Sequence, residues 1–227
     1  MNLFQTPFFL PWLYPQLVWR MPVHEKKVYL TFDDGPAPGP TEFVLETLKQ
    51  YNAIATFFCI GDNVQKHPEV FTKILAAGHA IGNHTFNHLK GWSTPLHTYV
   101  DNTNKCEAVF QSYLSNRLPL TDHHLPTTDY RPPITNHQLF RPPYGRITRS
   151  QIKALKEKYK IIMWDVLTQD YRQIITPDKC IRGTIEATRA GSVVVFHDSY
   201  KAEPNLMFAL PRYLEYLTAE GYTFGKL

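Results

Sequence analysis

Residues 28–36 read Val28-Tyr29-Leu30-Thr31-Phe32-Asp33-Asp34-Gly35-Pro36, an apolar run of strand length that ends in two adjacent acids and a turn. A helical pattern follows from Pro40, in which Val44 and Leu48 recur on one face and Thr41 is predicted to cap the helix. A strand that leads through a short turn into an amphipathic helix is the repeating unit of a parallel α/β sheet.

The alternation of strands and helices continues to the end of the chain. Further strands are predicted at 55–60, 79–82, 138–140, 160–164, 192–196 and 222–224. Helices are predicted at 68–77, 97–114, 150–159, 177–189 and 206–220. About seven strands of this kind predict a distorted parallel (β/α) barrel, related to the TIM barrel, with its active site at the C-terminal ends of the strands. An open, doubly wound sheet is the alternative.

The composition describes one globular domain. Hydrophobic residues make up 43% of the 227 residues and charged residues 19%, a balance that can build a large core and is unlike that of disordered chains. The formal net charge is +4 without a long Lys/Arg run, so nucleic acid is not an expected partner. Three cysteines without a Cys-x-x-Cys pair exclude a disulfide framework and a thiolate zinc site.

Residues 1–26 are apolar and aromatic, and we expect them to pack as an extension on the domain formed by residues 27–227. Prolines interrupt any long helix in this extension, so neither a transmembrane span nor a signal peptide is recognised. A cytoplasmic location is the default expectation, with the cell envelope as the alternative. A loop insertion at 116–137 breaks the alternation, and loops longer than about 12–15 residues are uncommon unless they are functional or disordered.

Chemically active side chains follow the predicted strands, always at the carboxyl end. They are Asp33, Asp34, His84, His88, Arg141, Tyr144, Asp165, Asp170, His197 and Asp198. The carboxyl ends of parallel strands meet at one rim of the sheet, where the active sites of α/β folds are assembled from several loops. We therefore expect these side chains to share one site.

Two histidines four residues apart, His84 and His88, can face the same way, and imidazole with a carboxylate suits zinc and similar divalent ions. Asp33 and Asp34 supply the carboxylate. Adjacent side chains point in different directions, so one can hold the ion while the other faces the attacking water. An Asp-His-His set leaves coordination positions open, which is typical of a catalytic metal. His197, at the end of a buried strand on the same rim, is predicted to protonate a leaving group.

Five segments of the chain occur in a recognisable order: Thr31–Pro36, His84–His88, Arg141–Tyr144, Trp164–Tyr171 and Val193–His197. They resemble the five motifs of the polysaccharide deacetylases of the NodB-homology type, carbohydrate esterase family 4. The resemblance spans residues 27 to 225, almost the whole chain. The first two motifs together are its most specific part.

The resemblance implies the chemistry of five residues. Asp34, His84 and His88 would bind a divalent metal, with zinc expected and cobalt, nickel or iron as alternatives. Asp33 would be the general base for the attacking water, and His197 would be the general acid for the leaving amine.

The resemblance also implies residues that support these groups. Arg141 would pair with Asp33 and hold its charge. Asp170 would orient and tune His197, while the backbone N–H of Tyr144 would help to stabilise the oxyanion. The substrate-binding residues that it implies are Tyr171, Val195 and Pro142.

Two positions depart from the motifs. Leu167 stands where the fourth motif usually has an acid, and Tyr171 stands where it usually has a tryptophan, which leaves the shape of the substrate pocket open. Asp165 lies outside the matched positions and is interpreted as structural. The segment Arg131-Pro132-Pro133-Ile134 repeats the start of the third motif without its tyrosine, so we take the segment at Arg141 as that motif.

The predicted function is a metal-dependent hydrolase that removes N-acetyl groups from glycans containing N-acetylglucosamine. The expected partner is such a glycan, either peptidoglycan, a chitin-like oligosaccharide or another polysaccharide, and the oligomeric state is left open. An O-acetyl esterase or a small cyclic-amide hydrolase is the alternative within the enzymes. An inactive carbohydrate-binding scaffold is the alternative from another class, and it is disfavoured because the predicted base, acid and metal ligands are all present.

Overall fold

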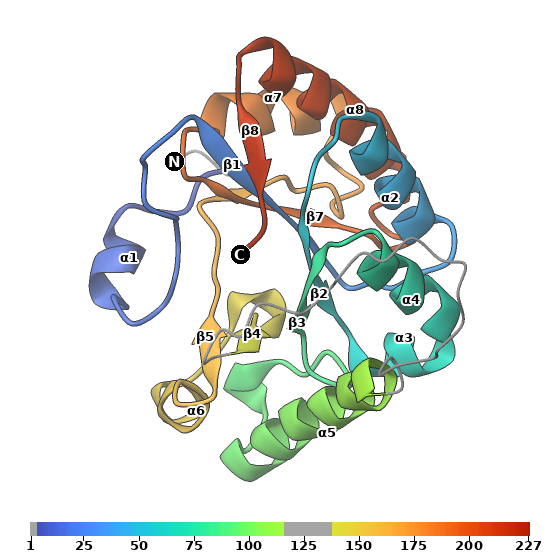
Figure 1. Ribbon diagram of the computed structural model, residues 1–227. Coiled ribbons are helices and arrows are strands. Elements are labelled where there is room, and N and C mark those ends of the chain that lie inside the picture. The colour runs from blue at the N-terminus through green and yellow to red at the C-terminus, as the bar shows by residue number, and fades with distance from the viewer. Residues whose placement is uncertain (1–3, 116–137) are drawn as a thin grey trace.

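A parallel sheet curled into an incomplete barrel forms the centre of the molecule (Figure 1). The computed structural model describes residues 4–115 and 138–227, so the predicted loop at 116–137 lies outside the described residues. The strands are β1 (Lys27–Asp33), β2 (Thr56–Cys59), β3 (Ala80–Asn83), β4 (Gln138–Phe140), β5 (Tyr159–Ile161), β6 (Val166–Leu167), β7 (Val193–His197) and β8 (Thr223–Gly225). They pair in the order β5-β4-β3-β2-β1-β7-β6, with β8 beside β1. This is the order of a barrel with an open seam between β5 and β6, which confirms the predicted distorted (β/α) barrel.

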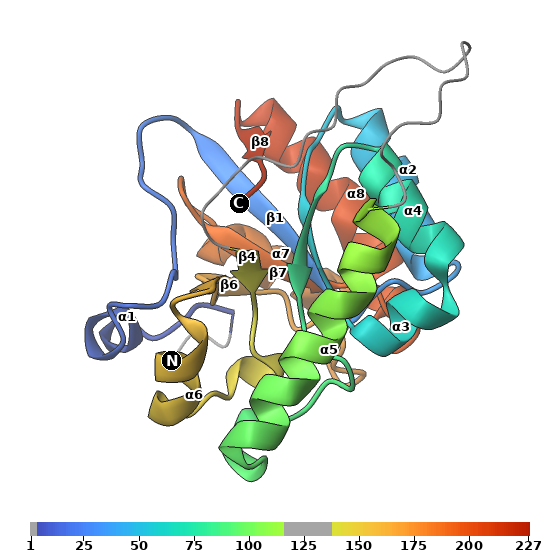
Figure 2. The same ribbon diagram turned by 60° about the horizontal axis from the view of Figure 1, so that its bottom comes forward.

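Helices surround the sheet on its outer side (Figures 1 and 2). They are α1 (Phe9–Leu13), α2 (Pro40–Gln50), α3 (Gly61–Lys66), α4 (Pro68–Ala76), α5 (Leu96–Ser115), α6 (Arg149–Leu155), α7 (Pro177–Ala187) and α8 (Glu203–Ala219), with short 3-10 turns at Gly91–Ser93 and Pro143–Gly145. Within residues 4–115 and 138–227, no helix combines the length and hydrophobicity needed to cross a bilayer.

The core lies between the sheet and these helices. Phe32 of β1 stacks between Phe57 of β2 and Phe196 of β7, with ring centroids 5.1 and 5.9 Å apart. All three rings belong to one cluster of buried side chains that also includes residues of α2, α4 and α8. Burial of this apolar layer fixes the middle strands, so their carboxyl ends are held on a rigid base.

The helix after β1 begins before its predicted cap. Pro40 is the first residue of α2, and Thr41 lies inside the first turn, because proline has a helical φ and lacks the N–H that would need a partner there. The hydroxyl of Thr41 donates instead to Asp198, at 2.6 Å. The predicted capping role of Thr41 was therefore wrong.

The chain between β5 and β6 also differs from prediction. The strand predicted at 160–164 ends at Ile161, because Ile162 pairs with Val18 of the N-terminal segment. Three helices or strands were not predicted: α1 with 5 residues, α3 with 6 and β6 with 2. Elements this short do not display a hydrophobic period.

The N-terminal segment, residues 4–20, fills the seam between β5 and β6. Gln5 pairs with Val166 of β6, and Val18 pairs with Ile162 directly after β5. Backbone groups at both strand edges thus gain partners. In Figure 1 this segment and α1 occupy the gap in the ring of helices between α6 and α7.

Asp165 anchors this segment to the barrel. Its carboxylate accepts hydrogen bonds from Arg189 at 2.8 and 3.1 Å and from the Ser192 hydroxyl at 2.7 Å. The Nε atom of Arg20 lies 3.4 Å from the same carboxylate. These contacts agree with the interpretation of Asp165 as a structural residue.

We expect Asp165→Asn to lower the free energy of unfolding by about 1–3 kcal/mol, because the charge-assisted bonds to the two arginines are lost at a buried position. Chemical denaturation followed by tryptophan fluorescence measures the change. Asp101→Asn, on the exposed side of α5, is the control and should change this free energy by less than about 0.5 kcal/mol. Equal effects of the two substitutions would contradict the anchoring role.

Candidate active site

The register of the sheet brings the ends of its strands to one rim. Asp33, the last residue of β1, pairs with Phe58 of β2 and with His197 of β7. Asn83, the last residue of β3, pairs with Phe140 of β4. Most of the chemically active residues identified in the sequence follow directly from these positions and lie close together in space. Asp165 is the exception, because it precedes β6 and bonds to Ser192 at the start of β7, so it lies outside this rim and does not share the site as expected.

A fully buried ion pair joins Arg141 to Asp33. The Nη1 atom of Arg141 donates to Asp33 Oδ1 at 2.7 Å and to the Thr31 hydroxyl at 2.6 Å. Nη2 donates to the carbonyl of Met163 at 2.9 Å, and Nε donates to that of Ile162 at 3.3 Å. Arg141 has no exposed surface. Its bonds therefore fix both the charge and the orientation of Asp33.

Asp34, His84 and His88 form a candidate metal centre. Each residue offers a ligand atom, and these atoms lie within 4.8 Å of one another. The Nε2 atoms of His84 and His88 lie 3.6 and 3.2 Å from Asp34 Oδ1. One carboxylate oxygen and two imidazole nitrogens are a donor set that suits zinc and similar divalent ions.

The protonation states of these groups favour metal binding. Burial lowers the pKa of His84 to about 4, so its ring is neutral at pH 7. Its Nδ1–H donates to the carbonyl of Arg141 at 2.8 Å, which leaves the Nε2 lone pair facing Asp34. Burial alone would raise the pKa of Asp34, but the hydrogen bond from His88 and the nearby histidines outweigh it and hold this pKa below its usual range.

His197 and Asp170 form a second pair on the same rim. Nδ1 of His197 lies 2.8 Å from Asp170 Oδ1, and the His197 backbone N–H donates to Oδ2 at 2.7 Å. Burial opposes a charge on His197, but attraction and hydrogen bonding from Asp170, with smaller contributions from Asp34 and Asp33, raise its pKa to about 9. Asn205 of α8 holds the backbone of Asp170 in turn, at 2.9 Å. His197 is therefore a cation at neutral pH.

Backbone strain is concentrated at this site. Among the described residues, six that are not glycine have a positive φ, and five of them belong to the rim: Asp34, Thr85, His88, Tyr144 and Gln169. This left-handed conformation is unfavourable for residues with a Cβ, and it persists only where the surrounding structure enforces it. All five lie within the motif segments, and Asp34, His88 and Tyr144 among them have an implied role, so the strain marks the same place as the motifs.

The residues implied to contact substrate lie at two depths. Tyr144 is 59% exposed, and its ring lies 4.5 Å from that of His88. Tyr171 is half-buried with its ring 4.8 Å from His197. Pro142 is buried and Val195 has no exposed surface. The two tyrosines are thus accessible beside the candidate metal and acid, whereas contact of Pro142 and Val195 with substrate stays a prediction.

Asp198 supports the site although no role was predicted for it. Its Oδ1 accepts from the Gly35 N–H at 3.1 Å, and its Oδ2 accepts from Thr41. A Cβ on Gly35 would lie 2.0 Å from the Asp198 carboxylate, so glycine is required next to Asp34. The sequence shows Asp198 directly after His197. Its partner Thr41 on α2 lies 157 positions away, so sequence pattern could not reveal the contact.

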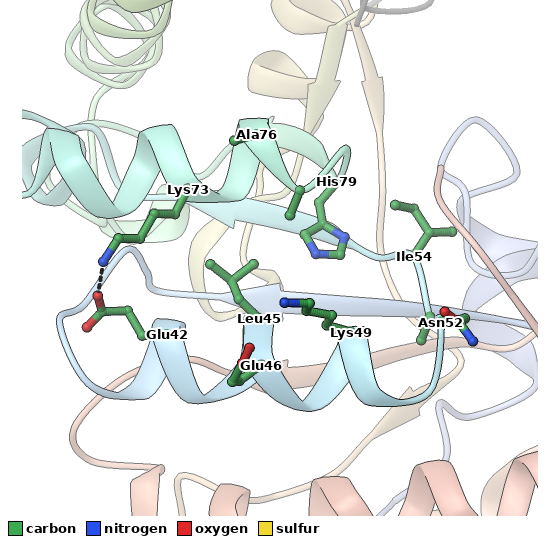
Figure 3. Close-up of a pocket in the computed structure, with 11 residues that line it drawn as sticks. Glu42, Leu45, Glu46, Lys49, Asn52, Ile54, Lys73, Ala76 and His79 are labelled. Atoms are coloured by element: carbon green, nitrogen blue, oxygen red, sulfur yellow. Dashed lines mark hydrogen bonds and ion pairs between the residues drawn. The ribbon is translucent and has the colours of Figure 1, made fainter. Parts of the chain in front are cut away.

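A separate cavity of about 790 Å³ lies between α2 and α4 (Figure 3). The ion pair of Glu42 with Lys73 spans one end of it, and His79 faces it near the other. Of the residues that the structure describes, none of those at the rim site lines this cavity. The chemistry expected from the sequence therefore belongs to the rim and not to this cavity.

Comparison with known proteins points to the same chemistry. The profile of the family described as polysaccharide deacetylase matches residues 20–159. A peptidoglycan-N-acetylglucosamine deacetylase of Bacillus cereus is 32% identical over 92% of this chain and 89% of its own. A chitooligosaccharide deacetylase of a Bradyrhizobium species is 30% identical over 77% of this chain and 72% of its own. Some other matched deacetylases are longer, and the chain spans 37% to 58% of them.

A solved structure has the same architecture. It is the crystal structure of a peptidoglycan N-acetylglucosamine deacetylase bound to a naphthyl-substituted N-hydroxybenzamide. The TM-score is 0.80, the sequences are 28% identical, and the alignment covers 98% of this chain and 95% of that one. The similarity therefore includes the N-terminal segment as well as the barrel.

We expect Arg141→Met to lower the free energy of unfolding by about 3–5 kcal/mol, because Asp33 is left as an uncompensated buried charge. Adding Asp33→Asn to the same chain should recover part of this loss, since the unpaired charge is then removed. Urea denaturation of the two single variants and the double variant measures the coupling between them. A double variant that is less stable than Arg141→Met would contradict the charge pairing.

Proposed function

Because this chain belongs to the polysaccharide deacetylase family, we propose that it removes the N-acetyl groups of N-acetylglucosamine units in peptidoglycan. The observation that carries the proposal is the arrangement at the rim, where the Asp34, His84 and His88 donors lie beside a buried Asp33 and a protonated His197. The Bacillus cereus relative, which carries that activity in its name, matches 92% of the chain. A chitin-like oligosaccharide is the second candidate substrate, favoured by the Bradyrhizobium relative.

The family uses a divalent metal, and we propose zinc held by Asp34, His84 and His88 in this chain. The donor set fits, because His84 is neutral with its Nε2 facing Asp34, and Asp34 is ionised. When bound, such an ion supplies a Lewis acid that polarises the acetamide carbonyl and acidifies water. Three protein ligands leave positions open for these tasks.

Asp33 is proposed to take the proton from the attacking water. Its Oδ1 accepts the bond from Arg141, which fixes the direction of the carboxylate. A base held in one orientation by a fully buried partner needs no rearrangement when the proton arrives. Arg141 thus acts through Asp33 and is proposed as a positioning residue.

His197 is proposed to give a proton to the leaving amine. An amine leaves an amide carbon only after protonation, so the acid must begin as a cation, as the raised pKa of His197 provides. Asp170 holds the ring by its Nδ1–H, which directs Nε2 away from Asp170. The backbone N–H of Tyr144 is the proposed donor to the oxyanion, in a strained turn where φ is 60°.

The remaining members of the site fit the same reaction. Tyr171, packed against His197, and Val195 and Pro142 beneath the rim are proposed to shape the space for the acetyl methyl group. Tyr171 and Leu167 depart from the family motif, so the width of this space is specific to this chain. An O-acetyl ester needs the protonated His197 less than an amide does, because an alkoxide can leave without prior protonation and an amide nitrogen cannot.

We expect metal-stripped protein to release no acetate from N-acetylated peptidoglycan fragments or chito-oligosaccharides, and added zinc to restore the release. Asp33→Asn should bind zinc like the parent protein and lose at least about 100-fold in kcat, because general-base catalysis contributes about that factor. His84→Ala should lose both the zinc and the activity. Acetate assays and zinc content by atomic emission measure the two effects separately.

His97→Ala, an exposed histidine on α5, is the matched control and should change neither quantity. Retained zinc and activity in His84→Ala would overturn the metal assignment. If the protein binds zinc but releases acetate from no glycan, the substrate would instead be an O-acetyl ester or a small cyclic amide. Glycan binding without zinc or activity would favour the inactive scaffold.

The pH profile provides a separate test of the acid. Activity should be lost as pH rises through the pKa of His197, since the general acid must be protonated, and this pKa lies at about 9 rather than the ordinary 6.5. Asp170, Asp34 and Asp33 are the charged groups that raise the pKa of His197. The parent protein and the Asp170→Asn variant are compared with the same metal bound. Asp170→Asn should therefore move the alkaline limb of kcat toward pH 6.5. An alkaline limb at the same pH in both proteins would exclude the Asp170–His197 pair from the reaction.

A further inference from the structure

A second cavity, of about 540 Å³, opens beside the candidate active site. Its volume lies within the range of about 300–1,000 Å³ that is typical of small-ligand sites. Aromatic rings dominate its wall: Tyr14, Trp19, Trp92, Tyr144 and Trp164. No charged side chain of the described residues lines it.

The cavity is continuous with the rim through Tyr144. One side of this residue lies in the cavity wall, and its ring lies 4.5 Å from that of His88, a candidate metal ligand. Leu167, in place of the acid usual in the fourth motif, also lines the cavity. The cavity and the candidate metal centre are therefore neighbours on the two sides of Tyr144.

The aromatic wall is held in place before any ligand arrives. The Nε1–H of Trp92 donates to the carbonyl of Ile147 at 3.2 Å, and the guanidinium of Arg146 lies 5.1 Å from the centre of its ring. Trp164 packs on Gly145, where a Cβ would approach its ring to 2.5 Å. Preorganised aromatic rings lose little entropy on binding, so they contribute efficiently to affinity.

The other wall comes from the N-terminal segment. Leu10, Leu13 and Tyr14, in or next to α1, line the cavity. This segment is fixed to the barrel where Thr6 Oγ1 donates to the carbonyl of Trp164 at 2.7 Å. Within the segment, Trp19 Nε1 donates to the carbonyl of Tyr14 at 3.1 Å. The segment that closes the seam of the barrel therefore also builds this cavity.

We propose that this cavity is a sugar-binding subsite, which holds an uncharged sugar unit next to the unit that is deacetylated. A pyranose ring presents apolar C–H faces, and the tyrosine and tryptophan rings of this wall present matching apolar faces. The uncharged wall offers no partner for the carboxylates of a peptide stem. The inference rests on the proposed function and assigns to the chain a preference for longer glycans.

The test compares N-acetylglucosamine itself, which has no second unit to fill the subsite, with its hexamer. Trp92→Ala should raise KM for the hexamer about tenfold and leave its kcat unchanged, because the lost contact lies away from the reacting atoms. The KM for the monomer should change less than about twofold in the same variant. Leu13→Glu, a half-exposed position that brings a charge into the cavity wall, should have the same length-dependent effect.

Trp12→Ala is the matched control, because Trp12 is 82% exposed on the same α1 and lies outside the cavity wall. It should leave both KM values as they are. Equal effects of Trp92→Ala and Trp12→Ala, or equal effects on monomer and hexamer, would overturn the subsite.

Calorimetric binding of the hexamer to metal-stripped protein separates this inference from the proposed function. Weaker binding by Trp92→Ala than by Trp12→Ala supports the subsite even where the parent protein releases no acetate. Acetate release by the parent protein with no loss of hexamer affinity in Trp92→Ala would retain the function and remove the subsite.

Discussion

The buried guanidinium of Arg141 is the constraint on which the rest of the site depends. A charge with no exposed surface is stable only if every donor finds a partner, and Arg141 finds them on Thr31 and Asp33 of β1 and on the carbonyls of Ile162 and Met163. These partners lie on opposite sides of the barrel interior. The arginine therefore ties the central strand to the chain at the seam, and a displacement of either side would leave a buried charge unpaired.

Burial has opposite consequences for the two histidines that the proposed chemistry needs. His84 is buried with its Nδ1 on a neutral carbonyl, so burial prevails and lowers its pKa to about 4, which keeps it a neutral ligand. His197 is buried against Asp170, whose charge outweighs burial and raises its pKa to about 9. The same cost of burial prevails over the nearby carboxylates at His84 and is outweighed by the hydrogen-bonded Asp170 at His197, which places the pKa values of the two rings on opposite sides of neutrality.

Sequence reasoning recovered what depends on local pattern. β1, β2 and β7 are buried on consecutive positions, so their apolar runs predict them, and the acids and histidines at their ends follow at once. It could not recover what depends on distant partners, such as the bond of Thr41 to Asp198 or the pairing of Val18 with Ile162. Local pattern alone left open which of Asp33 and Asp34 would hold a metal, and only the resemblance implied Asp34. In the structure Arg141 bonds to Asp33, whereas His84 and His88 lie beside Asp34, which supports that expectation.

The open seam explains why a barrel of this kind needs its N-terminal segment. Two neighbouring strand edges, at β5 and β6, would otherwise expose unpaired N–H and C=O groups. β6 has only 2 residues and cannot extend far enough to close the gap itself. A segment that pairs with both edges satisfies these groups at Gln5 and Val18, yet leaves the chain between them free to bulge outward as α1. That bulge provides one wall of the aromatic cavity beside Tyr144, so the incomplete closure of the barrel is also what gives the rim its second binding space.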